Sequence, residues 1–210
     1  MKTVVIASQK GGAGKSTLCA HLAVQAWLSG SAVYVIDTDP QGSLSAWHER
    51  RQADQPTLVD LPFESIGAGL DVLRGRGADM VFIDTAPSRS DENAALFGLA
   101  DLVVIPVRAS PADLWAVGAT VGQLKAVGVP FVFVLNAVKT NAGITAQAAA
   151  VLSQHGRVAE TFIGDRTSYA AAMVNGSTAI ELAPKGPAGR EMLSLHANMN
   201  DCLHANMKES

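Results

Sequence analysis

The sequence predicts an α/β protein with a mostly parallel, twisted sheet that carries helices on both faces, and three observations favour this class. Short apolar runs alternate with helical patterns along the 210-residue chain, as in repeated strand–helix units. The apolar runs show no polar alternation, which indicates strands buried on both faces. A glycine-rich segment follows the first run, and this order is typical of a turn that binds phosphate groups.

The individual elements follow from the same patterns. Runs rich in Val, Ile, Leu and Phe predict strands at Thr3–Ser8, Ala32–Asp37, Met80–Asp84, Leu102–Val107, Phe131–Asn136 and about Val158–Ile163, with a weaker one near Leu58–Leu61. Helical spacing predicts helices at Lys15–Ser29, Ser43–Arg51, Gly69–Arg74, Glu92–Leu99, Pro111–Val127, Thr145–His155 and Ser168–Asn175, and a last one over about residues 188–208. The helix from Pro111 has the clearest limits, since Ser110 can cap it and Gly128 can end it.

Length and composition limit the possible classes. The chain has 48% hydrophobic and 17% charged residues and no long Ser/Gly/Pro-rich linker, so we expect one domain over residues 1–210. A net charge of −3 excludes a polycation, so nucleic-acid binding would need a local basic face. Cys19 and Cys202 match no metal-binding spacing and are typical of reduced thiols. Without a signal peptide or an apolar run of the roughly 20 residues that span a bilayer, the expected location is cytoplasmic, with no stable membrane insertion.

The glycine-rich segment carries the residues of a nucleotide-binding loop, Lys10-Gly11-Gly12-Ala13-Gly14-Lys15-Ser16-Thr17. It departs from the common pattern G-x-x-x-x-G-K-[ST], because Gln9 stands where the first glycine would be. Glycine lets backbone N–H groups approach a polyphosphate closely, and the helix that starts near Lys15 adds the positive end of its dipole. Lys15 supplies a positive charge, and Ser16 is the expected Mg²⁺ ligand.

Lys10 is a second lysine in a loop that Lys15 already serves. Its place before the first glycine directs its side chain away from the nucleotide of its own chain. A second ammonium within about 4 Å of a phosphate oxygen would contribute roughly 4 kcal/mol at an effective dielectric constant near 20. Two interpretations fit the residue alone: it reaches a nucleotide held by a second subunit, or it is a solvated surface lysine.

Two further strands end on aspartates, at the sheet edge where open parallel sheets bind ligands. The second strand runs into Asp37-Thr38-Asp39-Pro40-Gln41, and both aspartates share one side of the chain if the strand extends that far. The fourth ends in Ile83-Asp84-Thr85-Ala86-Pro87, the Walker B pattern, whose carboxylate holds Mg²⁺. A helix cap or turn is the alternative for a single strand-end aspartate, but the phosphate loop upstream favours ion binding.

These segments together resemble the deviant Walker ATPases of the ParA/MinD type, and in particular the ParA family of plasmid and chromosome partition ATPases. The similarity to small plasmid-partition members extends through Asp101–Val107 and Ser110–Asp113. Near the end, Ile163–Arg166 and Gly176-Ser177 resemble a stretch that in the family reads Ile-Pro-x-Arg and later His/Asp-Gly, although Gly164 replaces the proline. The resemblance covers nearly the whole chain.

The resemblance implies an ATP hydrolase that uses ATP and Mg²⁺ and forms a homodimer in its ATP state. Lys10 would reach across this dimer to the partner's phosphates and act in catalysis together with Lys15. Asp39 would position the attacking water. Because part of the charge clamp comes from the second subunit, an isolated subunit would be slow.

The resemblance also assigns the remaining site residues. Ser16 and Asp84 would hold the Mg²⁺ ion, and Asp37 would support this metal site. Asn136 would recognise the adenine edge through its amide, or it is only a turn residue at a strand end.

Two uses of such a switch fit the sequence. The first is a nucleoid-associated partition ATPase, which binds DNA non-specifically and whose hydrolysis a ParB-like adaptor stimulates. Its candidate DNA contacts are Arg166, Lys185 and Arg190, each of which is otherwise a solvated charge. The second positions a protein cargo, such as a carboxysome or a chemoreceptor cluster, over the nucleoid or, like MinD, at the membrane. The tail Leu193–Ser210 has one lysine, Lys208, and suits anionic lipid poorly.

A metal-cluster reductase is a third class, which two distant cysteines argue against. The five histidines match no metal-binding motif. Trp27, Trp47 and Trp115 lie in helical patterns and are predicted to be packing residues rather than base-stacking platforms.

Overall fold

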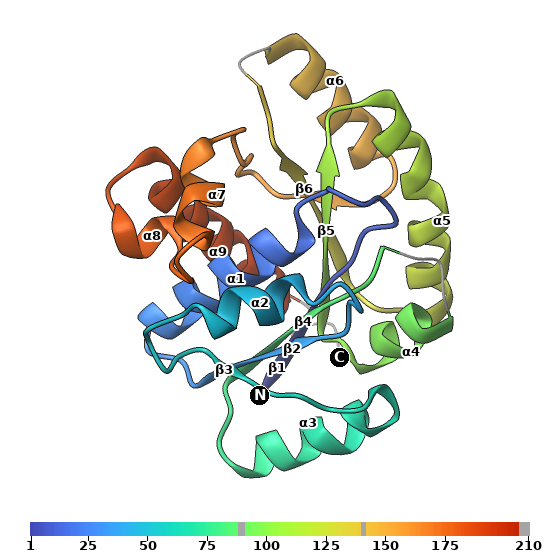
Figure 1. Cartoon of the computed structure of the whole chain (residues 1–210). Helices are drawn as coiled ribbons and strands as arrows, with labels where there is room; N and C mark the ends of the chain where they lie inside the picture. The colour runs from blue at the N-terminus through green and yellow to red at the C-terminus, as the bar shows by residue number, and fades with distance from the viewer. Residues whose placement is uncertain (88–90, 140–141, 206–210) are drawn as a thin grey trace.

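The computed structural model describes residues 1–87, 91–139 and 142–205, which form one seven-stranded sheet in which every strand pairing is parallel. The strand order is β3-β2-β4-β1-β5-β6-β7, so the first strand lies at the centre (Figure 1). The strands are β1 Lys2–Ile6, β2 Val33–Asp37, β3 Thr57–Leu58, β4 Met80–Asp84, β5 Leu102–Arg108, β6 Phe131–Asn136 and β7 Arg157–Val158. The predicted α/β class is confirmed, and the sheet is wholly rather than mostly parallel.

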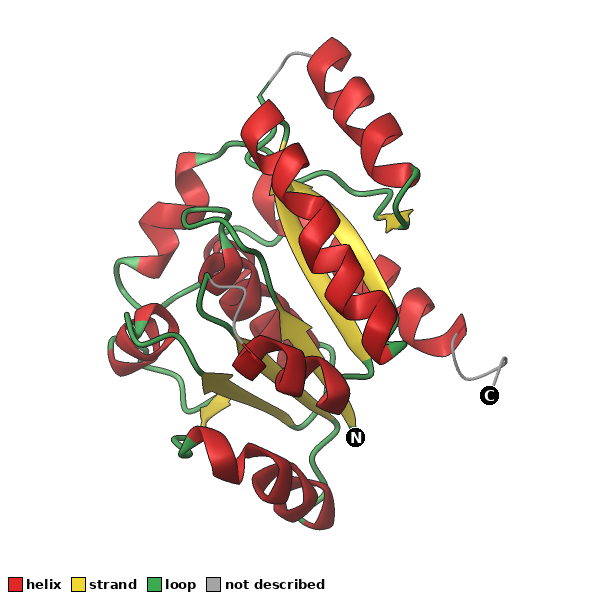
Figure 2. Cartoon of the chain, turned by 90° about the vertical axis from the view of Figure 1, so that its right-hand side faces the viewer, coloured by secondary structure: helices red, strands yellow, loops and turns green. Residues whose placement is uncertain are grey.

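Helices cover both faces of the sheet (Figures 1 and 2). One layer contains α1 Lys15–Leu28, α2 Ser43–Glu49, α7 Thr167–Met173, α8 Ala179–Leu182 and α9 Pro187–Ala205. The other contains α3 Ile66–Gly75, preceded by the 3₁₀ turn η1 Phe63–Ser65, together with α4 Asp91–Leu99, α5 Pro111–Val127 and α6 Ala142–Ser153. None of the helices in the described ranges combines the length and apolar character that a membrane span needs.

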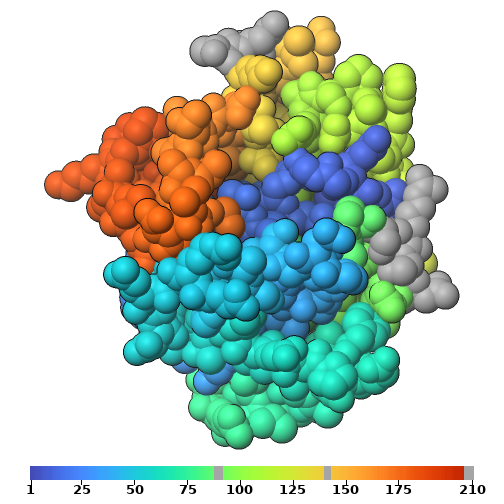
Figure 3. All heavy atoms as spheres, in the orientation of Figure 1, coloured from blue at the N-terminus to red at the C-terminus, as the bar shows by residue number. Residues whose placement is uncertain are grey.

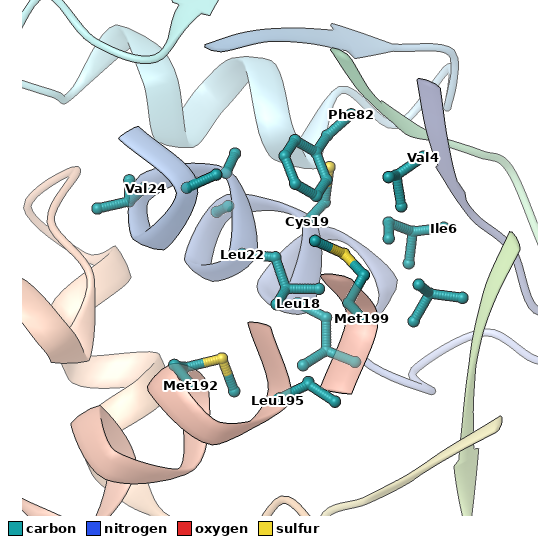
Figure 4. Close-up of a cluster of buried hydrophobic side chains, with 14 of the residues drawn as sticks. Val4, Ile6, Leu18, Cys19, Leu22, Val24, Phe82, Met192, Leu195 and Met199 are labelled. Carbon is teal, nitrogen blue, oxygen red and sulfur yellow. The ribbon is translucent and has the colours of Figure 1, made fainter. Parts of the chain in front are cut away.

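Two hydrophobic cores lie between these layers and the sheet. Successive strand residues point to opposite faces, so in β1 Val4 and Ile6 enter one core and Val5 enters the other. The helix α1 is buried between the sheet and α9, and Figure 4 shows where they meet. The labelled side chains there are Leu18, Cys19 and Leu22 of α1 and Met192, Leu195 and Met199 of α9. The helix that follows the phosphate loop is therefore fixed from both sides.

The last strand is shorter than the sequence predicts. β7 contains only Arg157–Val158, whereas an apolar run had indicated Val158–Ile163. The backbone N–H of Thr161 donates to Oδ1 of Asn198 in α9, at 3.1 Å. The N–H groups of Ala159 and Ile163 still donate to carbonyls of β6, at 2.8 and 2.9 Å, so both β6 and the C-terminal helix hold this part of the chain.

Two further expectations need correction. The four-residue helix α8 is not among the helices predicted from the sequence, although the capping box of Thr178 and Glu181 indicates its start. Trp115 is not a packing residue, because it is 82% exposed on α5, whereas Trp47 is buried. The last helix is described to Ala205, and its predicted continuation to residue 208 lies outside the described residues.

Polar contacts attach the C-terminal helices to α1 and α2. His21 of α1 is fully buried; its Nδ1 lies 2.8 Å from the carbonyl of Thr17, and its Nε2 accepts the N–H of Ala179 at 3.0 Å. This pattern fixes a neutral ring with the proton on Nδ1. The buried guanidinium of Arg51 donates to both carboxylate oxygens of Glu181, at 3.0 and 2.7 Å.

The conformation of Gly176 explains the glycine in the motif Gly176-Ser177. Its φ is +70°, and a Cβ atom there would lie 2.3 Å from the backbone of Arg50 and Arg51. Only glycine allows this turn to approach the end of α2 so closely. The indole N–H of Trp47 also donates to the carbonyl of Ser177, at 3.0 Å.

We predict that His21 makes the free energy of unfolding depend on pH. Burial lowers the pKa of His21 from 6.5 to about 4. The stabilisation from the neutral ring is therefore fully present above pH 6.5 and is lost as the pH falls toward 4, in total roughly 3 kcal/mol. Denaturant unfolding at several pH values should give a flatter pH dependence for His21→Gln, which keeps a donor and an acceptor, than for the wild type.

His204→Gln is the matched control, because His204 is exposed. It should retain the wild-type dependence on pH. An equal pH dependence in His21→Gln and the wild type would contradict the prediction.

Candidate nucleotide-binding site

Strand register brings the predicted site residues together at the carboxyl edge of the sheet. Ile6, which ends β1, pairs with Asp84 at the end of β4, and Asp37 at the end of β2 pairs with Asp84 from the other side. The phosphate loop leaves β1 at the same edge. Figure 3 shows that this N-terminal part of the chain (blue) reaches the surface between the C-terminal helices (orange) and the middle of the chain (green).

The phosphate loop has the open, left-handed glycine geometry that its sequence predicts. Gly12 and Gly14 have φ values of +73° and +90°, and α1 begins directly afterwards at Lys15. The amide Nδ2 of Asn136 donates to the carbonyl of Ala13 at 2.7 Å, and a Cβ atom on Gly14 would lie 2.2 Å from Nδ2. Asn136 therefore holds the loop against β6, and its expected role in adenine recognition stays a prediction.

The two lysines of the loop have opposite environments. Lys15 is only 6% exposed, and burial lowers the pKa of its ammonium while the carboxylates of Asp84 and Asp39 oppose this shift. Lys10 is exposed, and within the described part of the chain its ammonium forms no ion pair. Its backbone N–H donates to the Ser8 hydroxyl, at 3.4 Å. Lys15 is therefore enclosed by its own chain, whereas Lys10 is open to solvent.

The carboxylate of Asp84 is buried and has no hydrogen-bond donor in the part of the chain that the structure describes. The residue is 0% exposed, and neither carboxylate oxygen accepts a hydrogen bond from the described residues. Burial raises the pKa of Asp84 to about 7, and the charges of Asp37 and Asp39 add to this rise. Ser16 and Lys15 oppose it, although the Ser16 hydroxyl does not reach full hydrogen-bonding geometry. A buried carboxylate in this state is strongly stabilised by a bound cation.

Asp37 and Asp39 do not lie on one continuous strand, because β2 ends at Asp37. Oδ1 of Asp37 accepts the backbone N–H of Asp39 at 3.1 Å, and Oδ2 accepts the N–H and hydroxyl of Ser45 at 2.8 and 3.0 Å. Oδ1 of Asp39 accepts the N–H of Gln41 at 3.0 Å. The condition for the two aspartates to share one side of an extended chain is therefore not met.

The donor set fits a Mg²⁺ ion shared with a nucleotide. Among the described residues, no three His, Cys, Asp or Glu side chains gather into a complete metal site. Asp84 offers two free oxygens and Ser16 a hydroxyl, and Mg²⁺ commonly takes one or two protein ligands together with phosphates and waters. Nothing in this arrangement requires Asp37 as a direct ligand.

A cavity of about 500 Å³ lies beyond Asn136 at the same edge. Its lining comes from the ends of β5 and β6, from α6 and from the loop after β7, and it includes Arg108, Ser110, Ala137, Lys139 and Asp165. Arg108 ends β5 and Lys139 follows β6, so both lie at the ligand edge, although neither was predicted as a site residue. The cavity is large enough for a nucleobase and part of a ribose.

The candidate DNA contacts differ in how free they are. The guanidinium of Arg166 forms hydrogen bonds with Glu191 at 2.9 and 2.6 Å, so it is engaged within the chain. Lys185 is exposed in the turn between α8 and α9, and Arg190 is exposed in the first turn of α9. The Arg190 guanidinium donates to the backbone carbonyl of Lys185, so these two residues lie close together.

Comparison with known proteins identifies the family. The model of the CobQ/CobB/MinD/ParA nucleotide binding domain matches residues 4–179, and the chain belongs to this family. The resemblance to ParA-type ATPases noted in the sequence is therefore confirmed.

Individual relatives differ in how much of their length is covered. Protein IncC of Escherichia coli is 32% identical over 149 residues, which cover 51% of this chain but only 41% of IncC. The maintenance of carboxysome distribution protein A of Halothiobacillus neapolitanus is 25% identical over 201 residues, or 91% of this chain and 93% of that protein. The fold is similar to the septum site-determining protein MinD of Pyrococcus horikoshii, complexed with Mg-ADP, with a TM-score of 0.77, 16% identity and coverage of 99% and 98%.

We predict that Asp84→Asn stabilises the chain when Mg²⁺ and nucleotide are absent. The pKa of Asp84 is raised from 3.8 to about 7, so its charge opposes folding above pH 3.8 and does so fully above about pH 7. At pH 8, denaturant unfolding should give the variant a free energy of unfolding roughly 2 to 4 kcal/mol higher.

The same measurement with Mg²⁺ and ATP should reverse the order, because only the wild type gains the stabilisation that comes from ion binding. Asp60→Asn removes an exposed carboxylate and is the control, expected to change neither value. A destabilised Asp84→Asn in the absence of ligand would contradict the prediction.

Proposed function

We propose that this chain is a Mg²⁺-dependent ATPase that forms a dimer when it binds ATP. The ATP-bound dimer then holds DNA, or holds a cargo on the DNA. The observation that carries the proposal is the contrast between Lys15 and Lys10. Lys15 is buried beside Asp84, as expected for a lysine that neutralises phosphate charge in its own chain. Lys10 is an exposed residue of the same loop, as expected for a lysine that acts on the phosphates of a second subunit.

Each site residue then has a role in ATP binding or hydrolysis. Gly11–Gly14 and Thr17 surround the phosphates, Ser16 and Asp84 hold Mg²⁺, and the ion neutralises the charge that develops on the phosphates. Asp39 orients the water, because its Oδ1 is fixed by Gln41 and its Oδ2 is left for the nucleophile.

The proposed dimer face includes the loop and α5. Ser8 and Lys10 line the same crevice as Asp113 and Ala116 of α5. Trp115 does not line this crevice, but it is largely exposed on the same helix, and exposed tryptophans are common in protein interfaces. We propose that a second copy that closes over the phosphate loop also packs on α5 and covers Trp115.

We predict that Lys15→Ala abolishes ATP binding, whereas Lys10→Ala permits binding but prevents ATP-dependent dimerisation. The first loses the buried charge that faces the phosphates, and the second loses only the contact across the dimer. Sedimentation with non-hydrolysable ATP measures the dimer, and equilibrium dialysis measures binding.

Lys2→Ala serves as the control, because Lys2 pairs with Asp101 at the amino end of the sheet. A normal ATP-dependent dimer of Lys10→Ala would refute the role of Lys10 across the interface. The fluorescence of Trp115 should change on dimerisation. The double variant Trp27→Phe/Trp47→Phe, in which Trp115 is the remaining tryptophan, isolates that signal.

Non-specific DNA binding by the ATP dimer is the second part of the proposal. Lys185 and Arg190 support it because they lie close together and exposed at the start of α9, and a dimer would present two such sites. Arg166 is a weaker candidate, since DNA would have to compete with Glu191 for its guanidinium.

We predict that Lys185→Glu with Arg190→Glu abolishes ATP-dependent DNA binding without preventing dimerisation. Wild-type affinity should fall by about 0.9 log units per log unit of salt for each phosphate neutralised. Filter binding at several salt concentrations tests both statements, with Lys125→Glu, on the exposed end of α5, as the control. An affinity for DNA that does not depend on ATP or on the salt concentration would contradict the proposed role in DNA partition.

Positioning of a protein cargo is the alternative function. The near full-length match to a carboxysome distribution protein supports this alternative. Both uses require an adaptor that stimulates hydrolysis, ParB-like in the first case and attached to the cargo in the second. Deleting the gene and measuring plasmid retention separates them, because only partition predicts plasmid loss. A MinD-like membrane role would instead require nucleotide-dependent flotation with anionic vesicles.

A further inference from the structure

Hydrogen bonds hold the turn that carries Asp39 to two neighbouring strand ends. On one side, the N–H and the hydroxyl of Thr38 both donate to the carbonyl of Asp84, at 2.9 and 2.8 Å. On the other side, the N–H of Asp39 donates to Oδ1 of Asp37. The backbone around Asp39 is thus tied to the end of β4 and to the end of β2.

Asp37 is in turn fixed by the first turn of α2. Gly42 is the N-cap of α2 and has no side chain to accept the free N–H groups of that turn. Oδ2 of Asp37 takes this role, since it accepts both the N–H and the hydroxyl of Ser45. We call Ser45, Asp37 and the N–H of Asp39 the aspartate clamp.

The hydrogen bonds of Asp37 argue against a role as an ion ligand. Its two oxygens already accept three donors, and an ion would have to displace at least one of them. Asp84, by contrast, is buried with no donor on either oxygen among the described residues. The two strand-end aspartates are adjacent in register but are prepared for different tasks.

We propose that Ser45 is a positioning residue for ATP hydrolysis, which acts through Asp37 to place Asp39 relative to the phosphate loop. The inference rests on the proposed function, in which Asp39 orients the attacking water. It differs from the sequence expectation for Asp37, because Asp37 sets the geometry of the turn and leaves the ion to Asp84 and Ser16. Small displacements of a group that orients a nucleophile reduce the rate strongly.

The kinetic test separates positioning from ion binding. Ser45→Ala removes one of the two donors to Oδ2 and should lower kcat about tenfold, and Asp37→Asn, which turns an N–H₂ group toward those donors, about a hundredfold. The KM for ATP and the Mg²⁺ concentration for half-maximal activity should stay within about twofold of the wild type. Ser45→Thr keeps the hydroxyl and should restore kcat.

Ser43→Ala is the matched control, because Ser43 is an exposed serine of the same helical turn. It should leave kcat unchanged. An unchanged kcat in Ser45→Ala, or a Mg²⁺ requirement in Asp37→Asn that rises while kcat is retained, would overturn the inference.

Amide hydrogen exchange of the chain without nucleotide tests the clamp independently of catalysis. The Asp39 amide should exchange about fivefold to tenfold faster in Ser45→Ala than in the wild type, and not faster in Ser43→Ala. Unchanged exchange would refute the clamp even if kcat fell. A wild type that hydrolyses no ATP would instead refute the proposed function, while faster Asp39 exchange would still support the clamp.

Discussion

The carboxylate of Asp84 is the constraint on which the rest of the site depends. A buried charge that accepts no hydrogen bond from the described residues opposes folding, and the surrounding β strands and helices make its burial tolerable. The central position of β4, between β1 and β2, is what excludes water from it. The same position places the phosphate loop on one side of Asp84 and the turn with Asp37 and Asp39 on the other. Both segments therefore lie beside the one carboxylate that a cation would stabilise.

This arrangement explains why the strand-end aspartates are not equivalent. Asp84 pairs with Ile6 on one side and Asp37 on the other and is enclosed, whereas β2 ends at a turn that supplies donors to Asp37. Sequence gives both the same appearance, an apolar run followed by aspartate. What separates them is the arrival of α2 beside Asp37, and the hydrogen bonds from Ser45 depend on the path of the chain over eight residues.

The sequence predicted those features that local signals determine. The limits of α5 follow from Ser110, Pro111 and Gly128, and those of β4 and β6 from apolar runs that end on polar residues. It failed where a distant partner takes a backbone hydrogen bond, as at Thr161, whose N–H donates to Asn198 of α9. In the site, the motif residues were identifiable from spacing, but the contact between Asn136 and the loop joins positions 123 residues apart and could not be read from either one.

The phosphate loop is already formed in the single chain, and this limits which contacts ATP could change if it acts as a switch. Gly12 and Gly14 already have their left-handed conformation, Lys15 is already buried, and α1 is fixed between the sheet and α9. A ligand shifts an equilibrium only through contacts that differ between its two states. Because the loop and α1 are already in place in the single chain, the differential contact has to come mainly from outside it. In the proposed mechanism the exposed ammonium of Lys10 supplies that contact, and dimerisation is the step that nucleotide controls.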